Sequence, residues 1–242
     1  MRLVIFSAFP HESRETLRNF AVTRRIKKPF KTYFVEHPSH EIALVQTRMG
    51  SQNAEAVLDY VLSEYNPDFI VSMGFGGALY DGAGAGDLIW PSKAVFISDR
   101  VEDTLELPDS GEIADRLSRK VIMDEGTVVT LQRWMKKSEI KKVAPELSLA
   151  VCDMETFPLA RGSIQRGIPF FAFRSITDMA DEDIPQELLN VSDESGEYKV
   201  SRSLKLLLSR PALIPNAARL GRTSRKASHK LWHAVRALVE TL

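Results

Sequence analysis

The segment "CDMETF", residues 152–157, places two acidic side chains, Asp153 and Glu155, beside a methionine in an otherwise apolar stretch. The apolar "LSLAV" precedes it, and "PLARGSIQRGIPFFAF" follows it. A buried carboxylate is costly unless a partner satisfies it. Because the segment closes a strand-like run, we expect these acids to belong to a site at the end of a strand.

Apolar, strand-like runs alternate with helix-like segments along the rest of the chain. In 51–65 the apolar residues recur at the helical period, with Ser51 as the expected N-cap. The alternation predicts an α/β protein, a single-domain three-layer α/β/α fold with a mixed central sheet. Ligands of such sheets bind at the C-terminal ends of the strands. The predicted strands are 2–9, 31–37, 41–48, 68–74, 88–97, 126–130, 147–152 and 170–177, and the predicted helices are 51–65, 110–121, 135–143 and 155–167.

The composition indicates a globular protein of a reducing compartment. The chain has 242 residues, of which 44% are hydrophobic, and no run of about 18 apolar residues suggests a membrane span. Cys152 is the single cysteine, so no internal disulfide can form. Residues 1–13 lack a signal-peptide cleavage site, so they are interpreted as the first strand. We therefore expect a cytoplasmic location.

The zero net charge hides an asymmetry between the two parts of the chain. Residues 198–242 carry ten Lys and Arg residues and a single acid, Glu240, which leaves the remainder at −9. We divide the chain into a catalytic domain, 1–197, and a basic amphipathic helical extension, 198–242. The extension could be a helix pair docked on the core, or a peripheral membrane contact that attracts anionic lipid. No motif supports a nucleic-acid partner.

Six glycines fall within "GFGGALYDGAGAGD", residues 74–87. Their backbone N–H groups could cradle an anion or a ribose phosphate, or the glycines could serve tight turns and close packing. The stretch is not a dinucleotide fingerprint, because it does not follow the first strand and lacks the third glycine. It is not a P-loop either, since Gly-Lys-Ser/Thr is absent.

Four segments together resemble the nucleoside phosphorylase/nucleosidase superfamily. They are "SAFPHE" (7–12), "SMGFGGAL" (72–79), "CDMETFPLA" (152–160) and "FRSITDMAD" (173–181). The likeness is to bacterial methylthioadenosine/S-adenosylhomocysteine nucleosidases and futalosine hydrolases, and it covers roughly residues 1 to 185. It implies an enzyme that cleaves the N-ribosidic bond of a purine nucleoside, adenine being the expected base, with no metal or other cofactor.

That reaction builds positive charge on the ribose and negative charge on the leaving base. The resemblance implies that Glu155 holds the ribose hydroxyls, with Met154 against the sugar. It gives Asp178 the role of the acid that protonates the base, supported by Thr177. A helix N-cap is the alternative interpretation of Asp178. Asp153 stays outside the catalytic set, because it could bond neighbouring polar groups instead.

The nucleophile is either water or phosphate. In the hydrolases of this family an acid after the first strand and an arginine share the water with the ribose-binding Glu. Glu12 and Arg174 stand at those positions, and Thr47 stands where a water-binding Ser is expected. A capping acid is the alternative interpretation of Glu12, and a structural ion pair that of Arg174.

Phosphorolysis is the alternative reaction, with phosphate as co-substrate. The hexameric bacterial phosphorylases use an Arg and a Ser where this chain has Ser72 and Phe75. However, Arg48 lies beside the helix start at Gly50, where its charge could hold phosphate.

The base pocket is the part with the weakest motif match. Trp134 could stack on a purine, and Gly76 and Gly77 are candidates for substrate contact. A nucleoside-binding protein without activity is the alternative class of function. The joint presence of the four candidate catalytic residues argues against it; these are Asp178, Glu12, Glu155 and Arg174.

The basic extension is similar to that of hopanoid-biosynthesis-associated phosphorylases, a branch of the same superfamily. This likeness implies a lipid-linked nucleoside such as adenosylhopane as a candidate substrate. The family likeness also implies a homo-oligomer. The pairs His37/His40 and His229/His233 lack a third ligand, so no metal site is expected.

Overall fold

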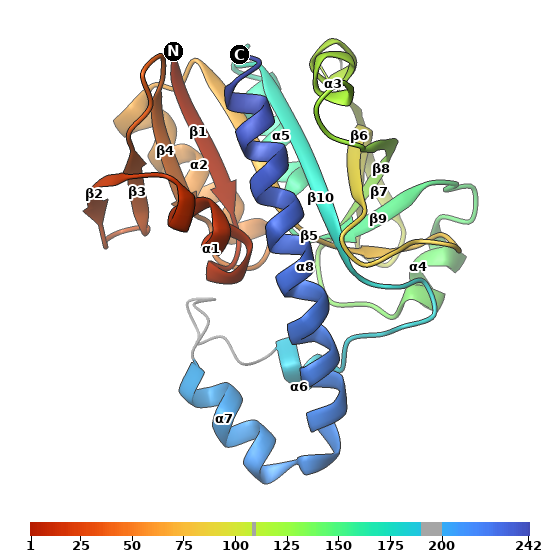
Figure 1. Cartoon of the computed structure of the whole chain (residues 1–242). Helices are drawn as coiled ribbons and strands as arrows, with labels where there is room; N and C mark the ends of the chain where they lie inside the picture. The colour runs from red at the N-terminus through yellow and green to blue at the C-terminus, as the bar shows by residue number, and fades with distance from the viewer. Residues whose placement is uncertain (108–109, 190–199) are drawn as a thin grey trace.

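The computed structural model describes residues 1–107, 110–189 and 200–242 (Figure 1). Its strands are β1 (Arg2–Ser7), β2 (Val22–Ile26), β3 (Thr32–Val35), β4 (Glu41–Gln46), β5 (Phe69–Ala78), β6 (Leu88–Ile97), β7 (Val101–Glu106), β8 (Asp124–Leu131), β9 (Ala150–Asp153) and β10 (Phe170–Asp178). Its helices are α1 (Pro10–Asn19), α2 (Ser51–Tyr65), α3 (Ser110–Ser118), α4 (Lys137–Val143), α5 (Thr156–Ile164), α6 (Gln186–Leu189), α7 (Val200–Ser209), the 3₁₀ turn η1 (Pro211–Leu213) and α8 (Ile214–Val239).

The described strands form one mixed sheet, as predicted. β1 lies between β4 and β5, and β5 pairs with β10; all of these pairings are parallel. β1 and β10 are buried along nearly their whole length because helices cover both faces of the sheet. Their C-terminal ends therefore point to one edge, where the chemistry of such sheets is found.

β5 makes the sheet close on itself on one side, which the sequence did not indicate. Its first half pairs with β1, from Phe69 to Ser72, and its last residues pair with β9 at Gly77 and Ala78. β10, β6 and β8 complete the ring from β5 back to β9. Glycines in a strand interior tolerate such a bend and a close approach of neighbouring backbone.

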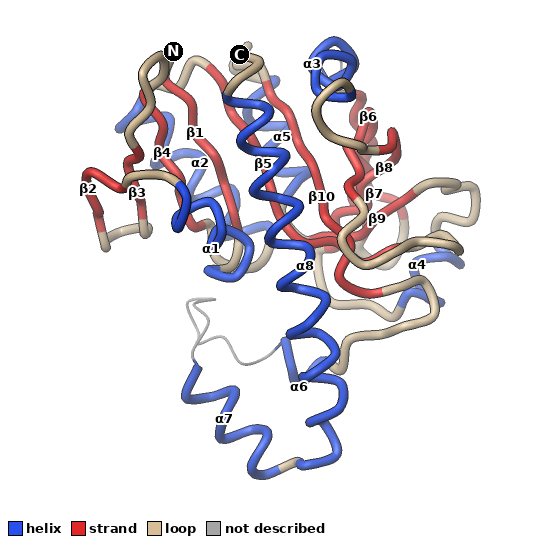
Figure 2. Tube along the Cα trace, viewed as in Figure 1, coloured by secondary structure: helices blue, strands red, loops and turns tan. Residues whose placement is uncertain are grey.

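Helices cover both faces of the sheet and give the three predicted layers (Figures 1 and 2). One face carries α1, α3 and α8, which share a core with apolar side chains of β1, β5 and β10. The other face carries α2 and α5, which bury Val57, Phe157 and Leu159. β10 and the glycine-rich end of β5 lie between these layers.

The structure differs from the sequence-based expectations at the N-cap of α2 and in two polar strands at the rim of the sheet. The 51–65 helix is confirmed, but Gly50 and not Ser51 occupies its N-cap, because Gly50 adopts φ +99° there. The Ser51 hydroxyl instead donates to the Met154 carbonyl at 3.0 Å. β2 and β7 were not predicted, since "VTRRI" and "VEDTLE" are polar strands at the rim of the sheet.

The basic extension is helical, and its two halves differ. The predicted boundary at 197/198 lies outside the described residues, so it stays a prediction. From Ala227 onward α8 packs on β5 and β10 and buries Leu231, Val235 and Leu238 in the core. Trp232 meets Phe20, the residue after α1, edge-on at 5.1 Å between ring centroids. This half of α8 is thus a core element, as in the docked-helix interpretation.

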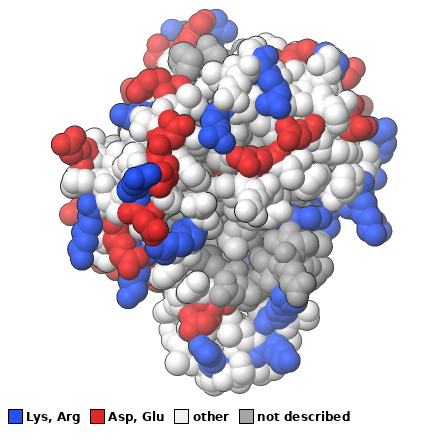
Figure 3. Space-filling model, turned by 180° about the vertical axis from the view of Figure 1, so that it is seen from behind, with Lys and Arg blue, Asp and Glu red and all other residues white. Residues whose placement is uncertain are grey.

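The other half belongs to a projection that we call the helical arm, made of α6, α7, η1 and residues 214–226 of α8 (Figure 1). Arg210 pairs with Glu187 at 2.6 Å within it. Within the described ranges, no helix has the length and apolar character needed to cross a bilayer. Figure 3 shows acidic and basic side chains intermixed over the body of the molecule on the face opposite to that of Figure 1.

Replacing Leu231 by Ala should lower the free energy of unfolding by about 2–5 kcal/mol, because a fully buried leucine leaves a cavity. The matched control is Leu204→Ala on α7, which is exposed and should change stability by less than about 0.5 kcal/mol. Urea denaturation followed by circular dichroism measures both. Equal effects would mean that α8 contributes nothing to the core.

Candidate active site

A cavity of about 140 Å³ opens where the C-terminal ends of β5, β9 and β10 meet the first turn of α1. Its walls also include the segment between β8 and α4. The predicted site residues that line it are Glu12, Gly76, Gly77, Trp134, Met154, Glu155, Thr177 and Asp178. The structure therefore brings together residues that lie far apart in the sequence.

The glycines of β5 make room for carboxylates. A Cβ atom on Gly74 would lie 2.9 Å from Glu12 Oε1, and one on Gly77 would lie 2.6 Å from Asp178 Oδ2. Side chains at these positions would displace the acids of the cavity. For this part of the glycine-rich stretch, close packing is therefore the correct interpretation.

Glu12 combines a local and a functional position. Its carboxylate accepts hydrogen bonds from the backbone N–H groups of Ala8 (2.6 Å), Phe9 (2.9 Å) and, across the cavity wall, Phe75 (2.8 Å). It caps the start of α1 and lines the cavity at the same time. Burial raises the pKa of Glu12, although these N–H groups and Arg174 oppose the shift.

Arg174 and Asp153 form a buried ion pair. Nη2 of Arg174 lies 2.7 Å from Asp153 Oδ2, and both side chains are 2% exposed. The guanidinium also donates to the carbonyls of Ser72 and Phe173 and to the Ser72 hydroxyl. Asp153 also accepts from the hydroxyl of Thr130 at 2.7 Å. The ion-pair interpretation of Arg174 is therefore correct, and Asp153 bonds its neighbours as expected.

Glu155 lies at the start of α5, directly after β9. Its carboxylate accepts the Gly50 N–H at 2.7 Å and faces the cavity beside Met154. Burial, reinforced by the charge of Asp153, raises the pKa of Glu155 to about 8. Such a group can carry either charge state near neutral pH.

Asp178 ends β10, and its partner was missed by the sequence analysis. Nζ of Lys137 lies 2.6 Å from Asp178 Oδ2, and both side chains are 7% exposed. The Thr177 hydroxyl donates to Oδ1 at 2.8 Å, as expected. Burial raises the pKa of Asp178 and outweighs the opposite effect of Lys137. Asp178 is a strand residue and caps no described helix, so the N-cap alternative is wrong.

Lys137 gave no signal in the sequence, because "MKKSEIKKV" has the pattern of an ordinary solvated helix. The lysine begins α4, which places it at the cavity wall. Lys136, its neighbour, points to solvent. Only the three-dimensional arrangement of α4 and β10 distinguishes these two lysines.

A much smaller cavity, of about 10 Å³, lies behind the first. Glu12, Thr47, Ser72, Glu155 and Arg174 are among the residues that line it. A cavity of this volume can hold about one water molecule. The residues expected to hold the nucleophile thus surround a space that fits a water molecule.

Arg48 lies outside both of these linings. Its guanidinium donates to the Pro29 carbonyl at 3.1 Å and lies 5.3 Å from the centre of the Phe30 ring. The side chain is therefore directed towards the loop before β3. Its position does not support the role of phosphate ligand.

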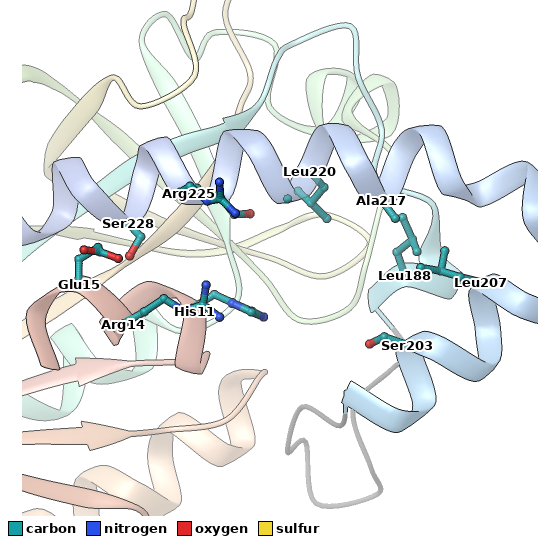
Figure 4. A pocket seen from close by; sticks show the side chains of 12 residues that line it. His11, Arg14, Glu15, Leu188, Ser203, Leu207, Ala217, Leu220, Arg225 and Ser228 are labelled. Atoms are coloured by element: carbon teal, nitrogen blue, oxygen red, sulfur yellow. The ribbon is translucent and has the colours of Figure 1, made fainter. Parts of the chain in front are cut away.

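A second large cavity, of about 380 Å³, lies between α1 and the helical arm (Figure 4). Arg14 of α1 and Arg225 of α8 face it at one end, and Leu188, Leu207 and Leu220 at the other. None of the predicted site residues lines this cavity. It lacks the paired buried acids of the first cavity, which remains the candidate active site.

A family model described as the phosphorylase superfamily matches residues 2–210. The chain belongs to the phosphorylase superfamily. This confirms the resemblance inferred from the four sequence segments and the prediction of an enzyme that acts on N-glycosidic bonds.

Similar members of the superfamily include 5'-methylthioadenosine/S-adenosylhomocysteine nucleosidases. That of Shewanella loihica is 24% identical over 191 residues, covering 69% of this chain and 81% of its own. That of an Exiguobacterium species is 27% identical over 236 residues, covering 86% and 97%.

Solved structures of the superfamily share the fold. The nucleosidase of Neisseria meningitidis, in complex with methylthio-immucillin-A, has a TM-score of 0.72 at 16% identity and covers 100% of this chain and 99% of its own. The futalosine hydrolase of Helicobacter pylori has a TM-score of 0.72 at 15% identity and covers 100% and 98%. The predicted fold class is thereby confirmed.

Metal chemistry finds no support in the part of the chain that the structure describes. No group of three or more His, Cys, Asp and Glu side chains is placed to hold a metal ion there. His37 stacks on His40, and His229 contacts His233, both outside the candidate active site. The expectation that this protein needs no cofactor stays a prediction.

Glu155→Gln should raise the melting temperature by several degrees at pH 9 and leave it nearly unchanged at pH 5. The folded protein holds a proton on Glu155 up to about pH 8, whereas the unfolded chain releases it near the ordinary value, so stability from this group is lost as the pH rises. Gln cannot ionise and escapes this loss. Differential scanning calorimetry at both pH values measures it.

The control for this experiment is Glu146→Gln, which alters an exposed glutamate. Its melting temperature should match that of the wild type at both pH values. A Glu155→Gln protein that behaves like this control would contradict the burial of an ionisable group at the site.

Proposed function

We propose that the chain hydrolyses the N-ribosidic bond of a purine nucleoside, adenine being the preferred base. The observation that carries the proposal is the placement of three acids around one cavity, with a water-sized space behind it. Glu12 and Asp178 are buried, and Glu155 is half-buried. Glu12 and Glu155 border both spaces, while Asp178 lies with Lys137 and Thr177 in the wall of the larger one. The names of the similar nucleosidases support the same reaction class.

The acid that meets the leaving base is Asp178. As the C1′–N9 bond breaks, its electron pair moves onto the purine, which then takes a proton at N7. A carboxyl group whose pKa is raised by burial is suited to deliver that proton near neutral pH. Trp134, in the same wall, offers a flat apolar surface to the base.

The ribose lies beside Glu155, and the attacking water lies beside Glu12. In its ionised form Glu155 accepts hydrogen bonds from the 2′- and 3′-hydroxyls and stabilises the positive charge that develops on the sugar. Glu12 accepts a proton from the water that attacks C1′. Arg174 has its donors engaged by protein groups, so its charge acts on these acids from behind.

Phosphorolysis is the second candidate for the reaction. It requires a cation that can reach a phosphate beside C1′, and Arg48 is directed elsewhere. A lipid-linked nucleoside and a binding protein without activity are the further candidates. These possibilities predict different results in one experiment.

Purine release from adenosine, methylthioadenosine, inosine and futalosine should proceed without phosphate and be unchanged by adding it. Asp178→Asn should reduce kcat about 10²–10⁴-fold, because the general acid is lost. Asp181→Asn, which alters an exposed acid nearby, is the control and should retain activity. A coupled adenine or hypoxanthine assay measures all three proteins.

Release that occurs only with phosphate would contradict hydrolysis and support the phosphorylase alternative. No release from any of the four nucleosides would contradict an action on small nucleosides. Adenine binding by calorimetry would then support the binding protein, and turnover of a lipid-linked nucleoside the remaining candidate.

We further propose that the helical arm contacts anionic membrane surfaces. Leu204 and Leu208 of α7 are 60% and 74% exposed, and Ile214 at the start of α8 is 50% exposed. Cationic side chains such as Lys205 share this segment. Exposed apolar side chains next to cations are typical of segments that lie in a membrane interface.

The double variant Leu204→Ser/Leu208→Ser should bind phosphatidylserine vesicles at least about tenfold more weakly than the wild type, since burial of each leucine is worth about 1.5–3 kcal/mol. Ile122→Ser, at a 90% exposed position outside the arm, is the control. Vesicle co-sedimentation measures binding. If light scattering instead shows a homo-oligomer that only the double variant disrupts, a second copy of the chain covers the arm and the membrane contact is wrong.

A further inference from the structure

The ammonium group of Lys137 has no hydrogen bond left for a substrate. Nζ lies 2.6 Å from Asp178 Oδ2, 3.0 Å from the Asp178 carbonyl oxygen and 2.5 Å from the Met179 carbonyl oxygen. An ammonium has three N–H donors, and these three acceptors use them all. The backbone N–H of Lys137 is fixed as well, by Asp183 Oδ1 at 3.0 Å.

This arrangement differs from that of a lysine that binds a substrate anion or a base oxygen. The Lys137 side chain is buried, and all of its acceptors belong to the last residue of β10 and the residue after it. It therefore holds both the carboxylate and the main chain of the Asp178 segment. Because two carbonyl oxygens accept from the same nitrogen, the ammonium cannot follow Asp178 if the carboxylate rotates away.

We propose that Lys137 is a positioning residue that fixes Asp178 towards the leaving base and stabilises the carboxylate formed when Asp178 releases its proton. This inference rests on the proposed function, because it assigns Lys137 a task in the same proton transfer. Lys137 itself touches no reacting atom.

The proton transfer balances without any proton from Lys137. To act as the acid, Asp178 has to begin as a neutral carboxyl group beside the cationic ammonium. When the C1′–N9 bond breaks, the electron pair goes to the purine, and the Asp178 proton goes to N7. The new carboxylate then forms a full ion pair with Lys137. Since that attraction exists only once the proton has moved, it favours the transition state over the bound substrate.

The other charged or titratable groups around Asp178 cannot replace this cation. Cys152 of β9 is held neutral, because burial raises the pKa of its thiol to about 12. Glu182, from the loop after β10, carries a negative charge that raises the pKa of Asp178 and is itself paired with Arg219. The neighbouring β5 contributes only Gly77 at this point. Lys137 of α4 is thus the cation that opposes the raised pKa.

Removal of Lys137 should lower the rate near neutral pH and move the alkaline limb of the pH profile to higher pH. Asp178 must be protonated to act, so kcat/KM falls as the pH rises through its pKa. Without the nearby cation that pKa rises, and the alkaline limb of the profile moves to higher pH by about 1–3 units. The acid is also weaker, so kcat near neutral pH should fall at least about tenfold.

The test compares Lys137→Met with Lys137→Arg and with Lys136→Met, using the full chain and adenosine. Arg keeps the charge, so its alkaline limb should stay within about half a unit of the wild type. Lys136 is exposed, and its replacement should alter neither rate nor profile. A Lys137→Met protein that is slower at every pH, with its alkaline limb in the wild-type position, would overturn the proposal and reduce Lys137 to a structural residue.

A second measurement does not depend on activity. Carboxyl ¹³C NMR titration identifies the Asp178 signal as the one missing from Asp178→Asn. Its midpoint should be higher in Lys137→Met than in the wild type, and an unchanged midpoint would overturn the proposal. If the midpoint rises while the wild type releases no purine, the coupling of Lys137 to Asp178 holds and the proposed function is what fails.

Discussion

The buried ion pair between Arg174 and Asp153 is the interaction on which the site depends. It joins the middle of β10 to the turn after β9, and through Ser72 it also joins β10 to β5. Removal of one partner from such a pair leaves an uncompensated charge and costs about 3–5 kcal/mol. The same guanidinium opposes the rise that burial causes in the pKa of both Glu12 and Glu155. One cation therefore fixes the three strands and moderates the acids placed at their ends.

The site gathers several acids in a small buried volume, which burial alone would make unfavourable. Each acid is satisfied differently: Glu12 by backbone N–H groups, Asp153 by Arg174, and Asp178 by Lys137. Glu155 has no cationic partner at hydrogen-bond distance and accepts backbone N–H groups of Gly50 and Met154, and burial raises its pKa to about 8. Acids with such different environments can take different charge states at one pH, as proton transfer and cation stabilisation together require.

Much of this structure can be predicted from the apolar patterns and short motifs of the sequence. β1 and the first half of β10 follow from apolar runs, and α2 follows from its helical period. The site motifs fall at the ends of these elements. The closure of the sheet could not be predicted, because it depends on β5 pairing with three strands, β1, β9 and β10, and a strand's partners are not encoded in its own pattern. The direction of Arg48 was equally hidden, since it depends on a contact with the distant Phe30.

The basic extension illustrates a different limit. Its sequence allowed both a docked helix pair and a membrane-surface segment, and the structure buries the apolar stripe of α8 from Ala227 onward while the cations stay solvated. All strands of the described sheet are synthesised before α8, so the β5–β10 face that α8 covers remains uncovered until that helix emerges. α1 and α8 also meet across nearly the whole described chain. Such distant partners make folding slow, and they leave the apolar face of the nascent sheet open to chaperones and to association with other chains.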